Sequence, residues 1–437
     1  MKYFSTKNKI TSYSLEEAVL LSLPPDNGLF MPEKIRQLRP EFLLNLKNEN
    51  VASIGYEIAK TLLGDDIPDD ILKKICDEAF NFPVNVVNVQ KDTYVCELFH
   101  GPTLAFKDFG ARFMSRIMSY LNRKHTTPLT ILVATSGDTG GAVADGFYNV
   151  DGIEVYILYP SGGVSELQEK QLTTYGKNIH AIEVKGTFDD CQRLVKQAFL
   201  DPELNEVYRL ASANSINIAR LIPQTVYYFE AFRKLPSKEN VVFVVPSGNF
   251  GNLTAGLIAR KMGLPVEHFV AATNINDVVP QYLSKGEFTP RASAPTISNA
   301  MDVGNPSNFP RMIELFANSW TDIKSAINGY SFTDDQTKAV MNDVFEKTGY
   351  ILDPHGAVAY LGWLEYQKEN PDSIGVILET AHPAKFSDSV EKALKLKIEI
   401  PEALEKLRNK TKVAHLMQAD YGEFKKYLLL KKSEPGF

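Results

Sequence analysis

Lys107 is the residue of this chain best suited to covalent chemistry. It lies in the largely apolar run from Phe99 to Gly110, where its ammonium group would lose contact with water. Desolvation favours the neutral amine, which can attack a carbonyl carbon and form a Schiff base. Gly101-Pro102 predicts a turn just before the lysine, and residues 108–114 are typical of a helix start. The alternative is a lysine whose stem packs along an amphipathic helix while its charged end reaches water.

A glycine-rich segment is the second candidate for chemistry. Residues 245–254, Val-Pro-Ser-Gly-Asn-Phe-Gly-Asn-Leu-Thr, follow an apolar strand and lead into a predicted helix that ends at Gly263. This order of strand, turn and helix aims backbone N–H groups and the helix dipole at a phosphate. The segment matches neither the dinucleotide-binding fingerprint nor the P-loop pattern, so a single phosphate fits better than a nucleotide. A purely structural turn is the alternative.

A second loop of this kind covers residues 134–142 and contains Ser136, Asp138 and Thr139. It follows a predicted strand, and ligands of open α/β sheets bind at the carboxyl ends of strands. Its hydroxyl and N–H groups suit a small carboxylate. Asp138 would repel such a ligand unless its side chain faces elsewhere.

A third loop carries Asn214, Ser215 and Arg220. If a helix begins near Ser215, the polar side chains lie at its N-terminus and Arg220 points back toward it. Arginine binds phosphate through paired hydrogen bonds. The alternative is a helix cap beside a surface arginine. Two phosphate-competent loops and a desolvated lysine together indicate a phosphorylated aldehyde cofactor and a phosphorylated substrate.

The last candidate follows the predicted strand at residues 373–378. The hydroxyl of Thr380 can donate a hydrogen bond to a pyridine nitrogen. His100 and His355 lie in turn-like runs, and a structural role is favoured for both. His382 and Lys385 follow Thr380 at the same strand exit. His125, His180, His268 and His415 have no carboxylate or cysteine at ligand spacing, and no metal site is predicted.

The composition narrows the classes of partner. The chain has a net charge of -6 and a pI near 5.8, which argues against nucleic acid as a partner. Its three cysteines, Cys76, Cys96 and Cys191, form no CxxC pair and suit a reducing compartment. The start lacks the apolar region of a signal peptide, and no apolar run approaches the ~20 residues of a membrane helix. We therefore expect a soluble, cytoplasmic protein.

Predicted strands alternate with predicted helices through most of the chain. Helices are expected at 187–201, where Thr187 and Asp190 form a capping pair, and from Ser165 to Gly176. The strongly apolar strands would be covered on both faces, as in parallel sheets. The predicted strands are 130–135, 154–159, 179–184, 241–245, 268–272 and 373–378.

These elements predict an α/β protein with open, mainly parallel sheets and two lobes. The 437 residues exceed the ~250–300 at which single cores stop growing, so two or three domains are expected. Helical patterns dominate the start of the chain. We predict a helical N-terminal extension over 1–90 and a catalytic region over 91–437, into which a smaller lobe, roughly 125–210, is inserted.

With these residues in view, the chain resembles the threonine synthase family. These are pyridoxal 5'-phosphate enzymes of fold type II, the tryptophan-synthase β-subunit fold. The resemblance covers nearly the whole chain and is greatest to the longer bacterial and fungal branch. It is carried by the lysine run 99–109, by the loop 247–252, and by Asn214-Ser215-Ile216-Asn217 with Arg220.

The resemblance implies that Lys107 forms the Schiff base with the cofactor and that Thr380 faces the pyridine nitrogen. The implied cofactor-binding residues, besides these two, are Ser247, Gly248, Asn249, Phe250, Gly251 and Asn252. For the substrate, the family implies a carboxylate site at Ser136 and Thr139, and a phosphate site at Asn214, Ser215 and Arg220. Many relatives carry asparagine in place of Asp138, so the role of that position stays open.

The implied reaction converts O-phospho-L-homoserine and water into L-threonine and phosphate, by γ-elimination and β-addition of water, in threonine biosynthesis. We expect a monomer or homodimer with no nucleic-acid or membrane partner. Three alternatives stay open: a dehydratase or other β-replacing enzyme of the same fold, a phospho-lyase that releases a keto acid, and a cofactor carrier without activity.

Overall fold

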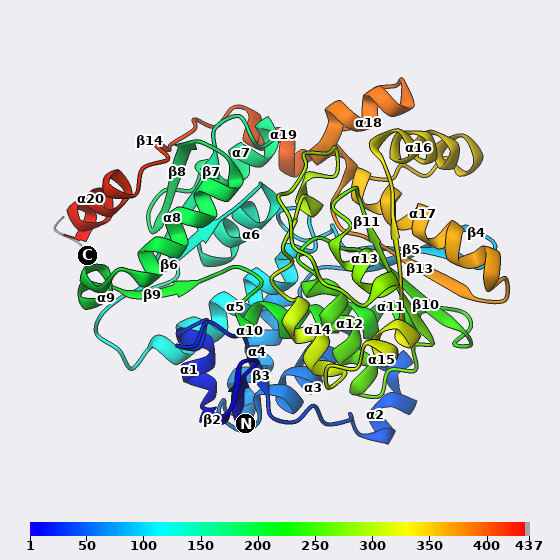
Figure 1. Cartoon of the computed structure of the whole chain (residues 1–437), viewed down its shortest axis with the longest axis horizontal. Helices are drawn as coiled ribbons and strands as arrows, with labels where there is room; N and C mark the ends of the chain where they lie inside the picture. Colours follow the sequence, from blue (N-terminus) through cyan, green and yellow to red (C-terminus); the bar gives the residue numbers. More distant parts are fainter. Residues whose placement is uncertain (433–437) are drawn as a thin grey trace.

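The computed structural model describes residues 1–432 and shows two lobes, each built on its own sheet (Figure 1). The larger sheet has six strands in the order β12-β11-β10-β13-β5-β4. All neighbours are parallel except β4 and β5, which are antiparallel. These strands are β4 (Asn85–Gln90), β5 (Thr93–Glu97), β10 (Val241–Pro246), β11 (His268–Thr273), β12 (Ile327–Ser331) and β13 (Ile374–Glu379).

Helices cover both faces of this sheet, which explains its unbroken apolar strands. Every residue of β10 is buried. Val242 and Val244 pack in the core beneath α17 (Pro354–Glu369), whereas Phe243 packs in the main core on the opposite face. Successive side chains of a strand point to opposite faces, so a strand covered twice has to be apolar throughout.

The smaller sheet has five parallel strands in the order β14-β8-β7-β6-β9. They are β6 (Leu129–Ala134), β7 (Ile153–Pro160), β8 (Ile179–Lys185), β9 (Arg209–Ser212) and β14 (His415–Gln418). The helices of this lobe are α6 (Asp138–Phe147), α7 (Glu166–Thr173), α8 (Phe188–Leu200), α9 (Pro202–Val207) and α20 (Tyr421–Lys432). The smaller lobe is therefore not one continuous insertion, because β14 returns from the end of the chain to its edge (Figure 1).

The predicted strands and caps agree with the structure. Each of the six predicted strands is present, with its ends displaced by one residue at most. Thr187 caps α8 through a reciprocal bond pair with Asp190, and Ser165 caps α7 in the same way with Gln168. The fold class predicted from the sequence is confirmed.

The N-terminal segment differs from the prediction because it is not purely helical. It contains a three-stranded antiparallel sheet of β1 (Tyr3–Ser5), β2 (Asn8–Tyr13) and β3 (Phe30–Pro32). Its helices are α1 (Leu15–Leu20), α2 (Pro40–Leu44), α3 (Val51–Leu63) and α4 (Asp69–Ala79). No residue of β2 is buried, so this strand lacks the alternation that identifies strands in a sequence. In addition, β4 belongs to the larger sheet, although it precedes residue 90.

The other helices complete the larger lobe and the junction between lobes. They are α5 (Lys107–Asn122), α10 (Ile218–Leu221), α11 (Val226–Lys234), α12 (Gly251–Lys261), α13 (Val278–Lys285), α14 (Phe309–Leu315), α15 (Trp320–Ala326), α16 (Asp334–Thr348), α18 (Ser387–Leu394) and α19 (Glu402–Arg408). Two 3-10 turns matter below, η3 (Asn299–Met301) and η4 (Pro383–Phe386).

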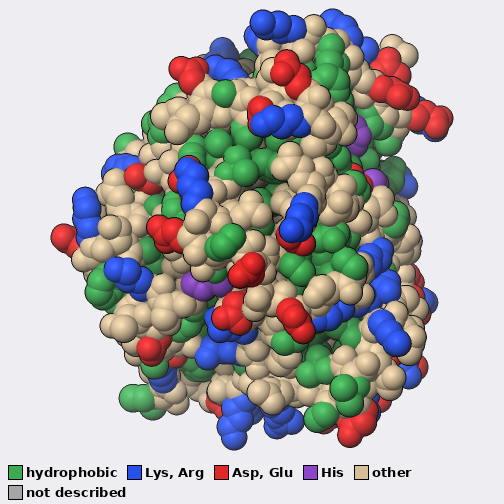
Figure 2. Space-filling view, turned by 90° about the vertical axis from the view of Figure 1, so that its right-hand side faces the viewer, with side chains coloured by type: hydrophobic (Ala, Val, Ile, Leu, Met, Phe, Trp, Pro, Cys, Tyr) green, Lys and Arg blue, Asp and Glu red, His purple; other side chains and the backbone are tan. Residues whose placement is uncertain are grey.

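Surface and redox features agree with the composition. Within residues 1–432, no helix combines the length and apolar character needed to cross a bilayer. On the face shown in Figure 2, acidic and basic side chains are interspersed. Cys76, Cys96 and Cys191 are all buried and free.

Candidate active site

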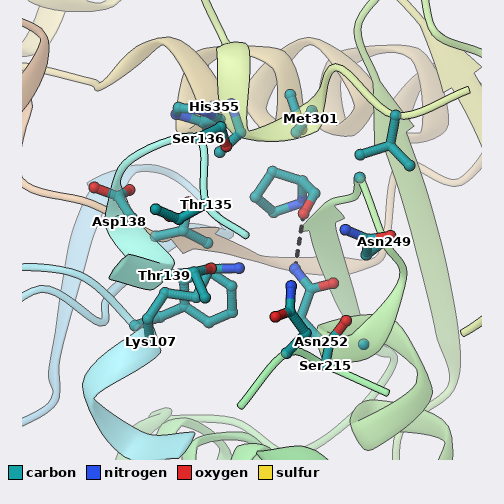
Figure 3. A pocket seen from close by; sticks show the side chains of 18 of the residues that line it. Lys107, Thr135, Ser136, Asp138, Thr139, Ser215, Asn249, Asn252, Met301 and His355 are labelled. Carbon is teal, nitrogen blue, oxygen red and sulfur yellow. Dashed lines mark hydrogen bonds between the residues drawn. The ribbon is translucent and has the colours of Figure 1, made fainter. Parts of the chain in front are cut away.

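One pocket collects residues from both lobes near the carboxyl ends of β6, β10 and β13 (Figure 3). It also meets the N-terminal ends of α5, α6 and α12. Of the predicted site residues, twelve line it: Lys107, Ser136, Thr139, Asn214, Ser215, Arg220, Gly248, Asn249, Phe250, Gly251, Asn252 and Thr380. Segments far apart in the sequence therefore converge on one volume.

Lys107 is the first residue of α5, and its amine reaches the pocket. Burial and, to a smaller extent, the neighbouring positive charge of Arg220 lower the pKa of Lys107 to about 8, against the opposing effect of Asp138. Its Nζ also lies 4.6 Å from the centre of the Phe106 ring. The neutral amine that attacks a carbonyl is therefore far more abundant near neutral pH than it is for an ordinary lysine.

The loop before Lys107 is fixed to the exit of β13. Phe106 donates its N–H to Thr380 O at 2.8 Å, and His382 donates its N–H to Leu104 O at 3.0 Å. Leu104 has a positive φ of 57°, which is unusual for a branched side chain and stores strain at the site. These bonds hold Lys107 and Thr380 in a fixed relation.

The glycine-rich loop is arranged as an anion cradle. Asn252 donates from Nδ2 to Pro246 O at 2.7 Å, the dashed line in Figure 3. Phe250 has a positive φ of 61° and turns the chain into the N-terminus of α12. A Cβ at Gly248 would lie 2.8 Å from Ala300 O, so only glycine fits there. The first N–H groups of α12 lie toward the pocket, as a phosphate site requires.

Ser247 is the one predicted cofactor-binding residue that does not line this pocket. Its side chain is buried, and its hydroxyl donates to Val245 O at 2.9 Å. The hydroxyl is therefore engaged in holding the turn after β10.

Arg220 provides a cation to another part of the pocket. Its side chain is buried, and one terminal nitrogen donates to Ala213 O at 3.1 Å. Its Nε has no hydrogen-bond partner within the described part of the chain. Burial lowers the pKa of Arg220 to about 10, an effect that Asp108 opposes. A buried guanidinium with an unused donor calls for an anionic ligand.

Asp138 does not face the pocket as a free charge. It lies 2.8 Å from Lys385 Nζ, and Gln168 donates to it at 2.9 Å. Although burial acts to raise the pKa of Asp138, the nearby Lys385 cation lowers it on balance. The positive charge of Lys385 therefore offsets the repulsion that Asp138 was expected to exert on a substrate carboxylate.

Several pocket residues were missed by the sequence analysis. His355, for which a structural role was favoured, lines the pocket and is held by Asp353, with Nδ1 2.6 Å from Oδ1. Ala300 donates its N–H to His355 Nε2 at 3.2 Å. The Asp353-Pro354 pair is a helix-start signal that would have placed His355 in the first turn of α17. Residues 299–303 also line the pocket, from an irregular segment without a sequence signal.

The described side chains fit pyridoxal phosphate. An amine is available for its aldehyde, a backbone cradle for its phosphate and a buried threonine hydroxyl for its ring nitrogen. A family model described as "Pyridoxal-phosphate dependent enzyme" matches residues 87–379. Fold and site thus define a pyridoxal-phosphate-dependent enzyme of fold type II.

Two further family models describe the ends of the chain. "Threonine synthase N terminus" matches residues 2–80, and "Threonine synthase, C-terminal" matches residues 356–428. The threonine synthase of Escherichia coli is 44% identical over 435 residues, covering 98% of this chain and 99% of that protein. The chain belongs to the threonine synthase family.

Solved structures agree with this assignment. The crystal structure of threonine synthase from E. coli matches with a TM-score of 0.92 and 42% identity, covering 99% of this chain and 100% of that one. The structure of PLP-bound threonine synthase from Brucella melitensis matches with a TM-score of 0.91 and 33% identity, covering 99% and 100%.

Proposed function

We propose that this protein converts O-phospho-L-homoserine and water into L-threonine and inorganic phosphate. The observation that carries the proposal is the buried guanidinium of Arg220, which shares the pocket of Lys107 and has an unused Nε donor. The glycine-rich cradle accounts for the cofactor phosphate. A second anion-binding position in the same pocket suits a substrate that carries a phosphate of its own.

For the cofactor, we propose Lys107 as the covalent attachment point. Gly248, Asn249, Phe250, Gly251 and Asn252 hold its phosphate. Thr380 donates a hydrogen bond to its ring nitrogen. When bound, pyridoxal phosphate supplies an aldehyde and a conjugated ring that withdraws electrons from the α-carbon of an amino acid.

For the substrate, we propose that Ser136 and Thr139 bind the α-carboxylate. Asn214, Ser215 and Arg220 bind the phosphate that leaves. The neutral amine of Lys107, favoured by its lowered pKa, accepts the proton of the substrate α-carbon at Nζ. Arg220 stabilises the departing phosphate dianion, because its charge is desolvated and therefore strongly felt.

Product analysis with one substrate tests the proposal. Purified protein is incubated with cofactor and O-phospho-L-homoserine, and threonine, phosphate and keto acid are measured. We expect threonine and phosphate in equal amounts. Release of a keto acid would identify a phospho-lyase, activity on serine or threonine alone would identify a dehydratase, and cofactor binding without any turnover would identify a carrier.

The finer organisation of the protein is also a proposal. We propose a cytoplasmic location, supported by three buried free thiols, which persist in reducing compartments. We divide the chain into an N-terminal extension over 1–90, whose last strand β4 joins the larger sheet, and a catalytic region over 91–437. The smaller lobe lies roughly at 125–210, and β14 from the end of the chain completes its sheet. We propose that the protein is a monomer or a homodimer, and light scattering of the purified protein distinguishes these two states.

A further inference from the structure

A buried ion pair forms part of the pocket wall. Lys385 Nζ lies 2.8 Å from Asp138 Oδ1, and the two side chains are 0% and 6% exposed. The same Nζ donates to Thr103 O at 2.8 Å, and Gln168 donates to Asp138 Oδ1 at 2.9 Å. None of these side chains has a role in the proposed reaction.

This network joins the two lobes. Asp138 begins α6 and Gln168 lies on α7, both in the smaller lobe, whereas Lys385 belongs to η4 and Thr103 to the loop before α5. Ser165 Oγ also donates to Lys385 O at 3.2 Å. The lysine therefore holds the start of α6 against the loop that presents Lys107.

The pair also lies between two cavities. Asp138 lines the active-site pocket, whereas Lys385 and Gln168 line a neighbouring cavity of about 880 Å³. The two partners of this ion pair thus line different cavities, Asp138 the active-site pocket and Lys385 the larger one.

The charge of Asp138 matters because the proposed substrate is anionic at both its carboxylate and its phosphate. An unpaired carboxylate beside Ser136 and Thr139 would repel the substrate where it has to bind. Removing one partner of a buried ion pair leaves a costly unmatched charge. The other charged or titratable groups that face the pair are His355 and Lys107 on the side of Asp138, and Asp108 and His382 on the side of Lys385.

We propose that Lys385 is a positioning residue that neutralises Asp138 and so makes the start of α6 able to accept an anionic substrate. Only the effect on the KM for the substrate rests on the proposed function. Its central consequence is that loss of Lys385 is harmful because Asp138 is ionised, and that the harm diminishes when Asp138 is neutral.

Three variants test this: Lys385→Met, Asp138→Asn and the double variant that carries both. In Lys385→Met the KM for O-phospho-L-homoserine should rise about 30-fold relative to wild type at pH 8, as for an unmatched buried charge. The ratio should shrink at pH 6, because a buried carboxyl without its cation has a raised pKa and takes up a proton. In the double variant the KM should return most of the way to the wild-type value, and the ratio to wild type should no longer depend on pH.

A second measurement does not need the substrate. The urea midpoint of the full chain is compared at pH 5.5 and pH 8. In wild type the pKa of Asp138 is lowered, so its contribution to stability is present above the unfolded pKa of about 3.9. In Lys385→Met that pKa is raised instead, so stability falls as pH rises. The deficit of Lys385→Met should therefore be larger at pH 8 than at pH 5.5, and the double variant should show no such trend.

Lys406→Met is the matched control, because Lys406 forms an exposed pair with Glu402 at 2.7 Å and should leave KM and midpoint unchanged. A deficit of Lys385→Met that is equal at both pH values, or a double variant as impaired as the two single variants combined, would overturn the proposal. Absence of threonine formation by wild type would refute the proposed function instead, while the urea series would still decide the role of Lys385.

Discussion

Phe106 donates its backbone N–H to the carbonyl oxygen of Thr380 at 2.8 Å. This bond places the residue before Lys107 directly against the residue that follows β13, a central strand of the larger sheet. The bridge between Ala105 and Ala381 extends the same contact. The amine that would carry the cofactor and the hydroxyl that would meet its ring are therefore positioned by the same backbone contact.

Replacing Lys107 by alanine should abolish covalent attachment of the cofactor. Its lowered pKa favours the neutral amine, and it is the lysine that lines this pocket. Borohydride reduction followed by peptide mass spectrometry should find the adduct on Lys107 in wild type and none in the variant. Lys177→Ala, which changes a surface lysine, is the control. A reducible adduct in the pocket of Lys107→Ala would disprove the assignment.

Attachment of the cofactor should depend on pH with an inflection near 8. Burial lowers the pKa of Lys107 to about 8, so the neutral amine becomes more abundant as pH rises and then levels off. An ordinary lysine, with a pKa of about 10.4, would still gain neutral amine above pH 9. The rate of absorbance change after mixing cofactor-free protein with pyridoxal phosphate measures this, with Lys107→Ala subtracted. A rate that keeps rising to pH 10 would contradict the lowered pKa.

Gly248→Ala should weaken cofactor binding more than Gly251→Ala. A Cβ at Gly248 would lie 2.8 Å from Ala300 O and 2.9 Å from Met301 Cα, so the backbone of that segment has to move. At Gly251 the nearest atom, Asn308 Nδ2, would be at 3.4 Å, an ordinary contact. Equilibrium titration of both variants with pyridoxal phosphate compares them. Equal affinities would remove the steric explanation.

The sequence was sufficient to predict an element or a site residue wherever the pattern that identifies it lies within a few consecutive residues. The capping pair of Thr187 and Asp190 lies within one turn, and the strand at 241–246 is apolar because both of its faces are buried. Lys107 and the loop at 247–252 could be found for the same reason, since turn, glycine and helix start are contiguous in the chain. Lys107 and this loop meet in one pocket because ligand sites of open α/β sheets form at the carboxyl ends of neighbouring strands.

Long-range relations could not be predicted. Lys385 neutralises Asp138 across two lobes, and no spacing rule connects residues so far apart in the chain. His355 reaches the pocket only because α17 packs beneath the larger sheet. The strand β2 was missed because no residue along it is buried, so it has no periodic pattern, and β1 and β3 have only three residues each, too few to show one.

Arg220→Ala should selectively impair handling of the phosphorylated substrate. Loss of one partner of a buried charge pair costs roughly 2–5 kcal/mol, or on the order of 30- to 3000-fold in kcat/KM. Cofactor content should be retained, because the proposed cofactor phosphate lies at Gly248. Arg193→Ala, at a half-exposed guanidinium paired with Asp190 outside the pocket, is the control. Loss of cofactor with unchanged substrate kinetics would mean that the two phosphate sites are exchanged.

Thr380→Asp should change the chemistry of the bound cofactor without removing it. Thr380 is buried in the pocket, and its hydroxyl can donate to an unprotonated pyridine nitrogen. A carboxylate at the same place would favour the protonated nitrogen, which withdraws electrons more strongly and should divert turnover toward side products such as those of transamination. The nitrogen-15 chemical shift of the bound cofactor should therefore move toward the protonated value in the variant. Thr380→Ser, which keeps the hydroxyl, should retain the wild-type shift. If Thr380→Asp leaves the shift, the turnover and the product ratio unchanged, Thr380 does not meet the ring, and the Phe106–Thr380 bond serves only to position Lys107.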